Sequence, residues 1–268
     1  DIKRMDYPWL AGMASINRNF FIEDYSQATR YLPPEKIVVV QGACMPGQFL
    51  EEVAFIREQA LQDNRIQGIV AYAPLEDPRL ADEALQTLSA IPLVKGIRRM
   101  YDDDPSLCCS APFIAGLQKL PARDLSFDIS ILPSSMKATI RMIEKCPETR
   151  FILDHLGKPS IVNSKLDEFK QNMAILSSFP NVAAKISGLV TEADLEKWTG
   201  DDIMPYLEYA LNRFGFERLM FGSDWPVMLL ASSYEKWVLT VMRIIEGCTN
   251  EEKNRLFYTN AEEIYNLI

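Results

Sequence analysis

Two short segments of the sequence end an apolar run in residues capable of acid–base chemistry. The first, 151–159 (FILDHLGKP), contains His155, the only histidine in the chain. The second, 219–226 (LMFGSDWP), contains Asp224. An imidazole or a carboxylate can accept or deliver a proton during attack by water, and either can bind a divalent metal ion. His155 and Asp224 are therefore the candidate catalytic residues.

Both segments predict a buried strand that ends in a loop. The apolar runs are short and unalternating, and glycine and proline interrupt them directly afterwards. In a barrel of alternating strands and helices, active sites lie at the carboxyl ends of the strands. We therefore expect His155 and Asp224 to face each other across a barrel mouth. The structural alternatives are a histidine that satisfies buried backbone groups and an aspartate that caps the following helix.

His155 and Asp224 are also the candidate ligands of a metal ion. A catalytic zinc normally has three protein ligands, and these two residues supply only two. The sequence therefore leaves open a site without a metal and a site with one divalent, zinc-like ion.

Lys185 and Ser187 are candidates for contact with a substrate. They alternate with apolar residues in 182–187 (VAAKIS), so both point to the same side of one strand. A lysine directed into a barrel needs a partner, because an unpaired buried charge is costly. That partner is either a substrate group or a buried acid such as Asp154.

Other strand ends supply further candidates for substrate contact. Arg98 could bind a carboxylate or hydroxyl groups, although of the adjacent pair Arg98 and Arg99 one must face outward. Gln41 is a candidate by the same strand-end argument. Trp225 and Tyr72 could form the walls of a sugar pocket through their aromatic faces.

The elements that position these residues alternate along the chain as strand and helix. Apolar runs predict seven strands, at 36–41, 67–72, 93–98, 125–130, 150–154, 182–187 and 218–222. Spacings of three and four predict helices at 48–62, 79–89, 136–144, 166–178, 203–214, 234–246 and 261–268, with Asp202 and Asn260 as caps. This order predicts an α/β fold with a parallel sheet.

The fold class that we expect is a (β/α)8 TIM barrel that lacks its first strand in this chain. Seven strands are predicted where the barrel has eight, and 1–20 is loop-like. We therefore expect the missing strand to lie upstream of Asp1. The structural alternative is an open, doubly wound sheet of seven strands. The length suits one domain over 1–268.

Composition narrows the classes of partner. The 268 residues carry a net charge of -9, which disfavours nucleic acid and anionic membrane surfaces. No apolar run approaches the length of a membrane span. Five cysteines at spacings that match no metal motif are typical of reduced thiols in a cytoplasmic protein. We expect a small-molecule substrate, and the sequence leaves a homo-oligomer open.

Several motifs in one order resemble those of the amidohydrolase superfamily, and in particular its lactonases that open sugar-acid lactones and related cyclic esters. The resemblance extends over nearly the whole chain. The matching segments are 6–9 (DYPW), 153–159 (LDHLGKP), 184–189 (AKISGL), 191–194 (TEAD), 221–227 (FGSDWPV) and 260–265 (NAEEIY).

The resemblance implies a (β/α)8 barrel whose first strand ends in a His-x-His motif a few residues before the Tyr-Pro-Trp segment. It implies a lactonase in which Asp224 is the general base and His155 helps to polarise the carbonyl group. The superfamily broadly uses zinc or a similar ion, although this subgroup includes members that work without a tightly bound metal. The alternatives are a metal-dependent decarboxylase of the same superfamily and a non-catalytic barrel that binds a sugar acid.

Overall fold

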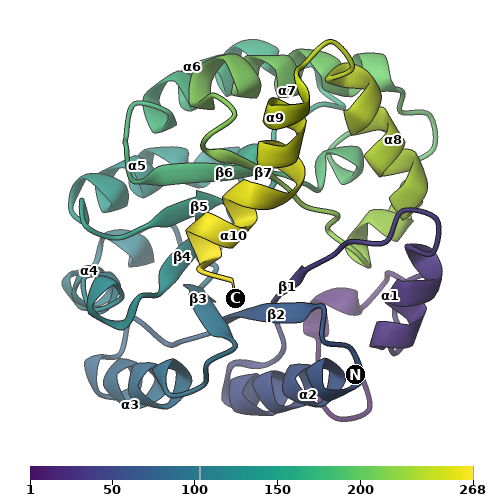
Figure 1. Ribbon diagram of the computed structural model, residues 1–268. Helices are drawn as coiled ribbons and strands as arrows, with labels where there is room; N and C mark the ends of the chain where they lie inside the picture. Colours follow the sequence, from purple (N-terminus) through teal and green to yellow (C-terminus); the bar gives the residue numbers. More distant parts are fainter. Residues whose placement is uncertain (103, 268) are drawn as a thin grey trace.

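A sheet of seven parallel strands forms the centre of the computed structural model, which describes residues 1–102 and 104–267 (Figure 1). The strands are β1 (Ile37–Val40), β2 (Ile66–Ala71), β3 (Val94–Arg98), β4 (Ser126–Ile129), β5 (Phe151–Leu153), β6 (Val182–Ile186) and β7 (Leu219–Phe221). They follow one another across the sheet in chain order. All seven predicted strands are confirmed, because short apolar runs mark the strands of a parallel sheet.

Helices surround the curled sheet on its outer face (Figure 1). Those that the sequence predicted are α2 (Phe49–Gln62), α3 (Pro78–Ser89), α5 (Met136–Glu144), α6 (Leu166–Leu176), α7 (Gly200–Phe214), α8 (Tyr234–Ile244) and α10 (Asn260–Tyr265). The prediction missed α1 (Ile22–Ala28), α4 (Ala111–Leu117) and α9 (Asn250–Asn254). These helices have seven residues or fewer, which is too short for a clear helical period. No described helix is long and apolar enough to cross a membrane.

The two predicted helix caps were wrong. Thr199 is the cap of α7, and Asp202 lies three residues further on, where its carboxylate accepts a hydrogen bond from the Thr199 amide at 2.8 Å. This is a capping box, in which the acid reaches back to the first residue. Asn260 lies inside a continuous helical stretch, and its side-chain amide donates to the carbonyl oxygen of Leu219 at 2.7 Å.

The ring of strands is open between β1 and β7 among the described residues. All four residues of β1 are half-buried, whereas β4, β5 and β6 are buried throughout, as expected for an edge strand. The fold is therefore a TIM-barrel-like half-barrel with one strand fewer than eight in the described part of the chain, as predicted.

Helix α1 continues the outer layer beside this opening, between α2 and α8 (Figure 1). The amide of Ile22 donates to the side chain of Gln59 on α2 at 2.9 Å. On the other side, the ring of Tyr25 packs against Tyr234 of α8, with 5.9 Å between centroids. The helical layer is thus continuous outside the gap between β1 and β7, where the described strands do not pair.

The closing helix α10 lies inside the ring and covers the amino-terminal end of the strands (Figure 1). Glu262 forms an ion pair with Lys36, directly before β1, and Asn266 donates to Asp124, before β4, at 3.0 Å. Tyr265 is 2% exposed and points into the barrel. This end is therefore a closed floor.

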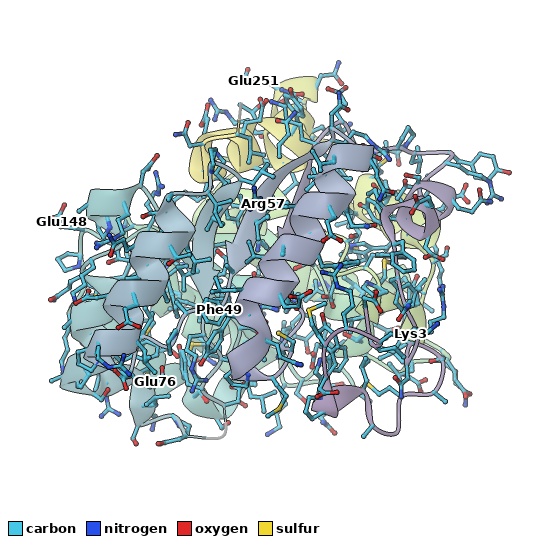
Figure 2. All side chains as sticks on the ribbon, turned by 90° about the horizontal axis from the view of Figure 1, so that it is seen from below. Lys3, Phe49, Arg57, Glu76, Glu148 and Glu251 are labelled. Carbon is cyan, nitrogen blue, oxygen red and sulfur yellow. The ribbon has the colours of Figure 1, made fainter. Side chains whose placement is uncertain are left out.

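The opposite end of the barrel is the mouth. In the side view of Figure 2, Glu76 and Phe49 lie toward this end, whereas Glu148 and Glu251 lie toward the floor. Lys3 also lies toward the mouth, so the first residues of the chain border it (Figure 2).

Candidate active site

Three of the predicted residues meet where β5, β6 and β7 end. The His155 Nδ1 atom lies 2.9 Å from the Ser187 hydroxyl oxygen, and His155 Nε2 lies 3.8 Å from Asp224 Oδ1. The side chains of His155 and Asp224 are 13% and 18% exposed, whereas Ser187 is 2% exposed. His155 and Asp224 can therefore meet a small molecule from the mouth, while Ser187 supports the imidazole from within.

A glycine allows the imidazole and the carboxylate to approach the β6 loop closely. Gly188 has φ +64°, and a β-carbon added there would lie 2.6 Å from His155 Nδ1 and 3.0 Å from Asp224 Oδ2. Both the backbone conformation and the missing space exclude a larger residue. The site is thus built around this glycine.

Left-handed backbone is concentrated at this edge. Asp224 has φ 58°, and His155, Leu156, Gly157 and Lys158 follow one another with φ values of 55°, 48°, 74° and 50°. A left-handed conformation costs about 1–2 kcal/mol for each non-glycine residue. Such strained backbone conformations persist only where the surrounding structure holds them, and they are common at functional sites.

Burial changes the proton affinity of both candidate catalytic groups. Burial lowers the pKa of His155 below 6.5, although the neighbouring Asp224 and Asp154 oppose the shift. Burial raises the pKa of Asp224 above 3.8, while His155 and Arg98 oppose that shift. At neutral pH His155 is therefore mostly uncharged, with one ring nitrogen free to accept a hydrogen bond.

Below the mouth, charged side chains form a network along the barrel interior. The Lys185 ammonium lies 2.5 Å from Asp128 and 2.8 Å from Asp154. Arg98 contacts the other oxygen of Asp154 at 3.0 Å, and the Tyr265 hydroxyl donates to Asp128 at 2.6 Å. The network therefore connects Tyr265 of α10, on the floor, to Asp154, which directly precedes His155 in the chain.

The charges within this network stabilise one another. Although burial alone would raise the pKa of Asp154, Lys185 and Arg98 hold it well below its usual range. Burial opposes the charged form of Lys185, but Asp128 and Asp154 raise its pKa. For Lys185 the geometry matches the ion-pair alternative, because its ammonium already contacts two carboxylates.

The remaining predicted residues lie around this core. The side-chain oxygen of Gln41 accepts a hydrogen bond from the Ala43 amide in its own loop at 2.5 Å. The backbone carbonyl oxygen of Gln41 accepts a hydrogen bond from the Arg98 guanidinium. Of the arginine pair, Arg98 turns inward and Arg99 pairs with Glu76 at 2.7 Å.

The two aromatic candidates are occupied by packing contacts. The ring of Tyr72 lies 5.6 Å from the Arg99 guanidinium and 5.7 Å from Phe49. The ring of Trp225 packs against Phe20 at 5.0 Å and against Tyr25 at 5.1 Å. Neither contact includes His155 or Asp224.

The donor set does not match a catalytic metal ion. His155 and Asp224 are close enough to share a ligand, but no group of three or more His, Cys, Asp or Glu residues in 1–102 and 104–267 is arranged to hold a metal. A catalytic zinc needs a third protein donor. The described residues alone therefore do not form a catalytic metal site.

Four residues at or near the site were not site candidates in the sequence, although three of them lie in segments that carry the family resemblance. Asp128 had a signal, because 126–130 (SFDIS) alternates polar and apolar residues and so points an acid to the inside of the barrel. Tyr265 on α10 gave no such signal. Lys158 and Glu192 lie in loops, where periodicity says nothing about direction.

Comparison with known proteins agrees with this architecture. A family model described as Amidohydrolase matches residues 6–267. An L-fucono-1,5-lactonase of Burkholderia multivorans is 29% identical over 98% of this chain and 91% of its own length. An L-rhamnono-gamma-lactonase of Scheffersomyces stipitis is 26% identical over 75% of this chain and 69% of its own.

A solved structure has a similar fold over nearly all of this chain. The crystal structure of an amidohydrolase from Burkholderia multivorans with bound zinc has a TM-score of 0.90 and 29% identity, over 98% of this chain and 94% of that one. The half-barrel, the strand-end site and the match over residues 6–267 lead to one conclusion: this chain belongs to the amidohydrolase family.

Proposed function

We propose that this protein hydrolyses a lactone of a sugar acid. The observation that carries the proposal is the meeting of Asp224, His155 and Ser187 at the mouth, with the first two partly open to a small molecule. The lactonases among its relatives support the choice of a cyclic ester as substrate. We take L-fucono-1,5-lactone and L-rhamnono-gamma-lactone as the first substrates to test.

In the proposed reaction, Asp224 activates a water molecule. Its carboxylate and His155 Nε2, 3.8 Å apart, can both contact one water. The carboxylate takes a proton from the water as its oxygen adds to the lactone carbonyl carbon. The bond from that carbon to the ring oxygen then breaks, and the ring oxygen takes the proton from Asp224. The product is the open-chain hydroxy acid, and the carboxylate is regenerated.

Ser187 has a supporting role in this proposal. The Ser–His–Asp set resembles the arrangement of enzymes with a serine nucleophile. However, Ser187 is 2% exposed and has little room for a substrate carbonyl. Its hydroxyl instead holds the imidazole in one orientation through the 2.9 Å hydrogen bond.

The Asp224→Asn variant tests the proposal. Asparagine tolerates left-handed backbone and has nearly the same shape, so the fold should survive while the base is lost. We expect kcat to fall by about 100-fold or more, the contribution of a general base, in a pH-indicator assay with the two lactones. The control is Asp201→Asn, at an exposed position of α7. Equal activity of Asp224→Asn and wild type would refute the assigned base.

A further inference from the structure

Lys158 is brought to the mouth by an unusual turn. The four residues from His155 to Lys158 all have left-handed backbone, and the Lys158 amide donates to the His155 carbonyl oxygen at 2.9 Å. In a turn closed by such a bond, side chains three residues apart lie on the same side. The Lys158 side chain is therefore directed to the side of the site on which His155 lies.

The charge of Lys158 favours the ionised forms of two carboxylates, Glu192 and Asp224. Burial raises the pKa of Glu192, and the Lys158 ammonium opposes this shift. Burial likewise raises the pKa of Asp224, and Lys158 is among the cations that oppose it. Both directions agree with the side-chain direction that the turn gives to Lys158.

Lys158 differs from the other basic residues of the site, which all form ion pairs within the described part of the chain. Arg98 and Lys185 each contact carboxylates at 3.0 Å or less, and Arg99 pairs with Glu76. Lys158 is half-buried, and it forms no ion pair within 4.0 Å in the part of the chain that the structure describes. Its charge is therefore free to contact a bound molecule, and the turn fixes the backbone from which the side chain extends.

We propose that Lys158 is a substrate-contacting residue whose ammonium binds the carbonyl oxygen of the lactone. This inference rests on the proposed function. When water adds to the carbonyl carbon, negative charge develops on that oxygen, and a positioned cation stabilises it. Lys158 would thus supply the electrostatic half of the reaction, while Asp224 takes the proton.

The Lys158→Met variant tests the inference through a split between kcat and KM. Methionine is unbranched at the β-carbon, so its backbone cost in the turn is similar to that of lysine. We expect kcat on L-fucono-1,5-lactone to fall about 100-fold, with KM changed less than about threefold, because the contact strengthens in the transition state. Lys158→Arg, which keeps the charge, should retain at least about a tenth of kcat.

The matched control is Lys165→Met, at an exposed lysine in the same connection between β5 and α6. Unchanged kcat in Lys158→Met would overturn the inference. A tenfold rise in KM at constant kcat would also overturn it, because it would indicate uniform binding. If Lys158→Met does not fold, loss of kcat in a folded Lys158→Arg variant would overturn the role of the charge.

A binding measurement separates failure of this inference from failure of the proposed function. L-fuconate, the open-chain hydroxy acid, carries carboxylate oxygens in place of the lactone carbonyl. By calorimetry, we expect Lys158→Met to bind it at least about tenfold more weakly than wild type does. If wild type binds L-fuconate through Lys158 but hydrolyses neither lactone, the proposed function fails and the contact stands. If wild type neither binds nor hydrolyses, both fail.

Discussion

At the scale of single residues, the site depends on backbone conformations that side chains normally avoid. Asp224 and His155 both have left-handed backbone, and Gly188 leaves no space for a β-carbon between them. These conformations are held by contacts such as the hydrogen bond between Ser187 and His155. The role of each contact can be measured by how much activity its loss removes.

Ser187→Ala distinguishes a supporting hydroxyl from a nucleophile. If Ser187 only orients His155, loss of one hydrogen bond of about 1 kcal/mol should lower kcat/KM about fivefold. Removal of a serine nucleophile would instead lower kcat by about 10⁶. Steady-state rates on the same lactones decide between them. A loss above about 10⁴ would contradict the supporting role.

At the scale of elements, the buried charge network holds the barrel together across its interior. Lys185 on β6 contacts Asp128 on β4 and Asp154 after β5, and Tyr265 brings α10 to the same carboxylate of Asp128. Removal of Lys185 would leave two buried carboxylates without their shared cation. Such a loss costs more than the pair contributes, because the remaining charges stay desolvated.

Lys185→Met should therefore lower the free energy of unfolding by about 3–5 kcal/mol, measured by urea denaturation. The control is Arg79→Met, which breaks an ion pair whose side chains are 72% and 63% exposed. An exposed pair contributes less than about 1 kcal/mol. If the two variants lose the same free energy of unfolding, the buried network contributes no more to stability than an exposed ion pair does.

At the scale of the whole molecule, the net charge does not describe the site. The chain carries -9 overall, yet two cations, Arg98 and Lys185, lie inside the barrel in contact with Asp128 and Asp154. The closed floor and the surrounding helices bury these groups, so each charge acts on its neighbours through little water. The pH dependence of activity should reflect this interior.

We predict that kcat/KM is lost as pH falls through the pKa of Asp224, at a pH above the ordinary aspartate value of 3.8. The ionised carboxylate is the active form, and burial raises its pKa, so the acid limb moves upward. His155, Arg98, Asp154 and Lys158 all act on this carboxylate. Initial rates from about pH 3 to 8, corrected for spontaneous lactone opening, locate the pH at which activity is lost.

Because His155 also titrates below neutrality, the limb belongs to the pair unless one group is removed. A His155→Gln variant leaves Asp224 as the titrating group, and its residual activity should keep an acid limb above pH 3.8. An acid limb at or below that value would contradict the raised pKa.

The sequence by itself determined the strands and the edge at which the site lies. Apolar runs are a local property, so all seven strands were predicted. Strand-end position and the motifs of the family marked His155 and Asp224 as candidates. The direction of Lys185 into the barrel also followed from alternation along one strand.

Only the tertiary structure decided which groups meet. Lys185 and Asp128 are 57 residues apart, and no local pattern pairs them. The same is true of Tyr265 and Asp128, 137 residues apart. The left-handed turn that directs Lys158 is disfavoured by its own residues, so the surrounding packing must impose it. Local preferences set the elements, and contacts between distant segments set the chemistry of the site.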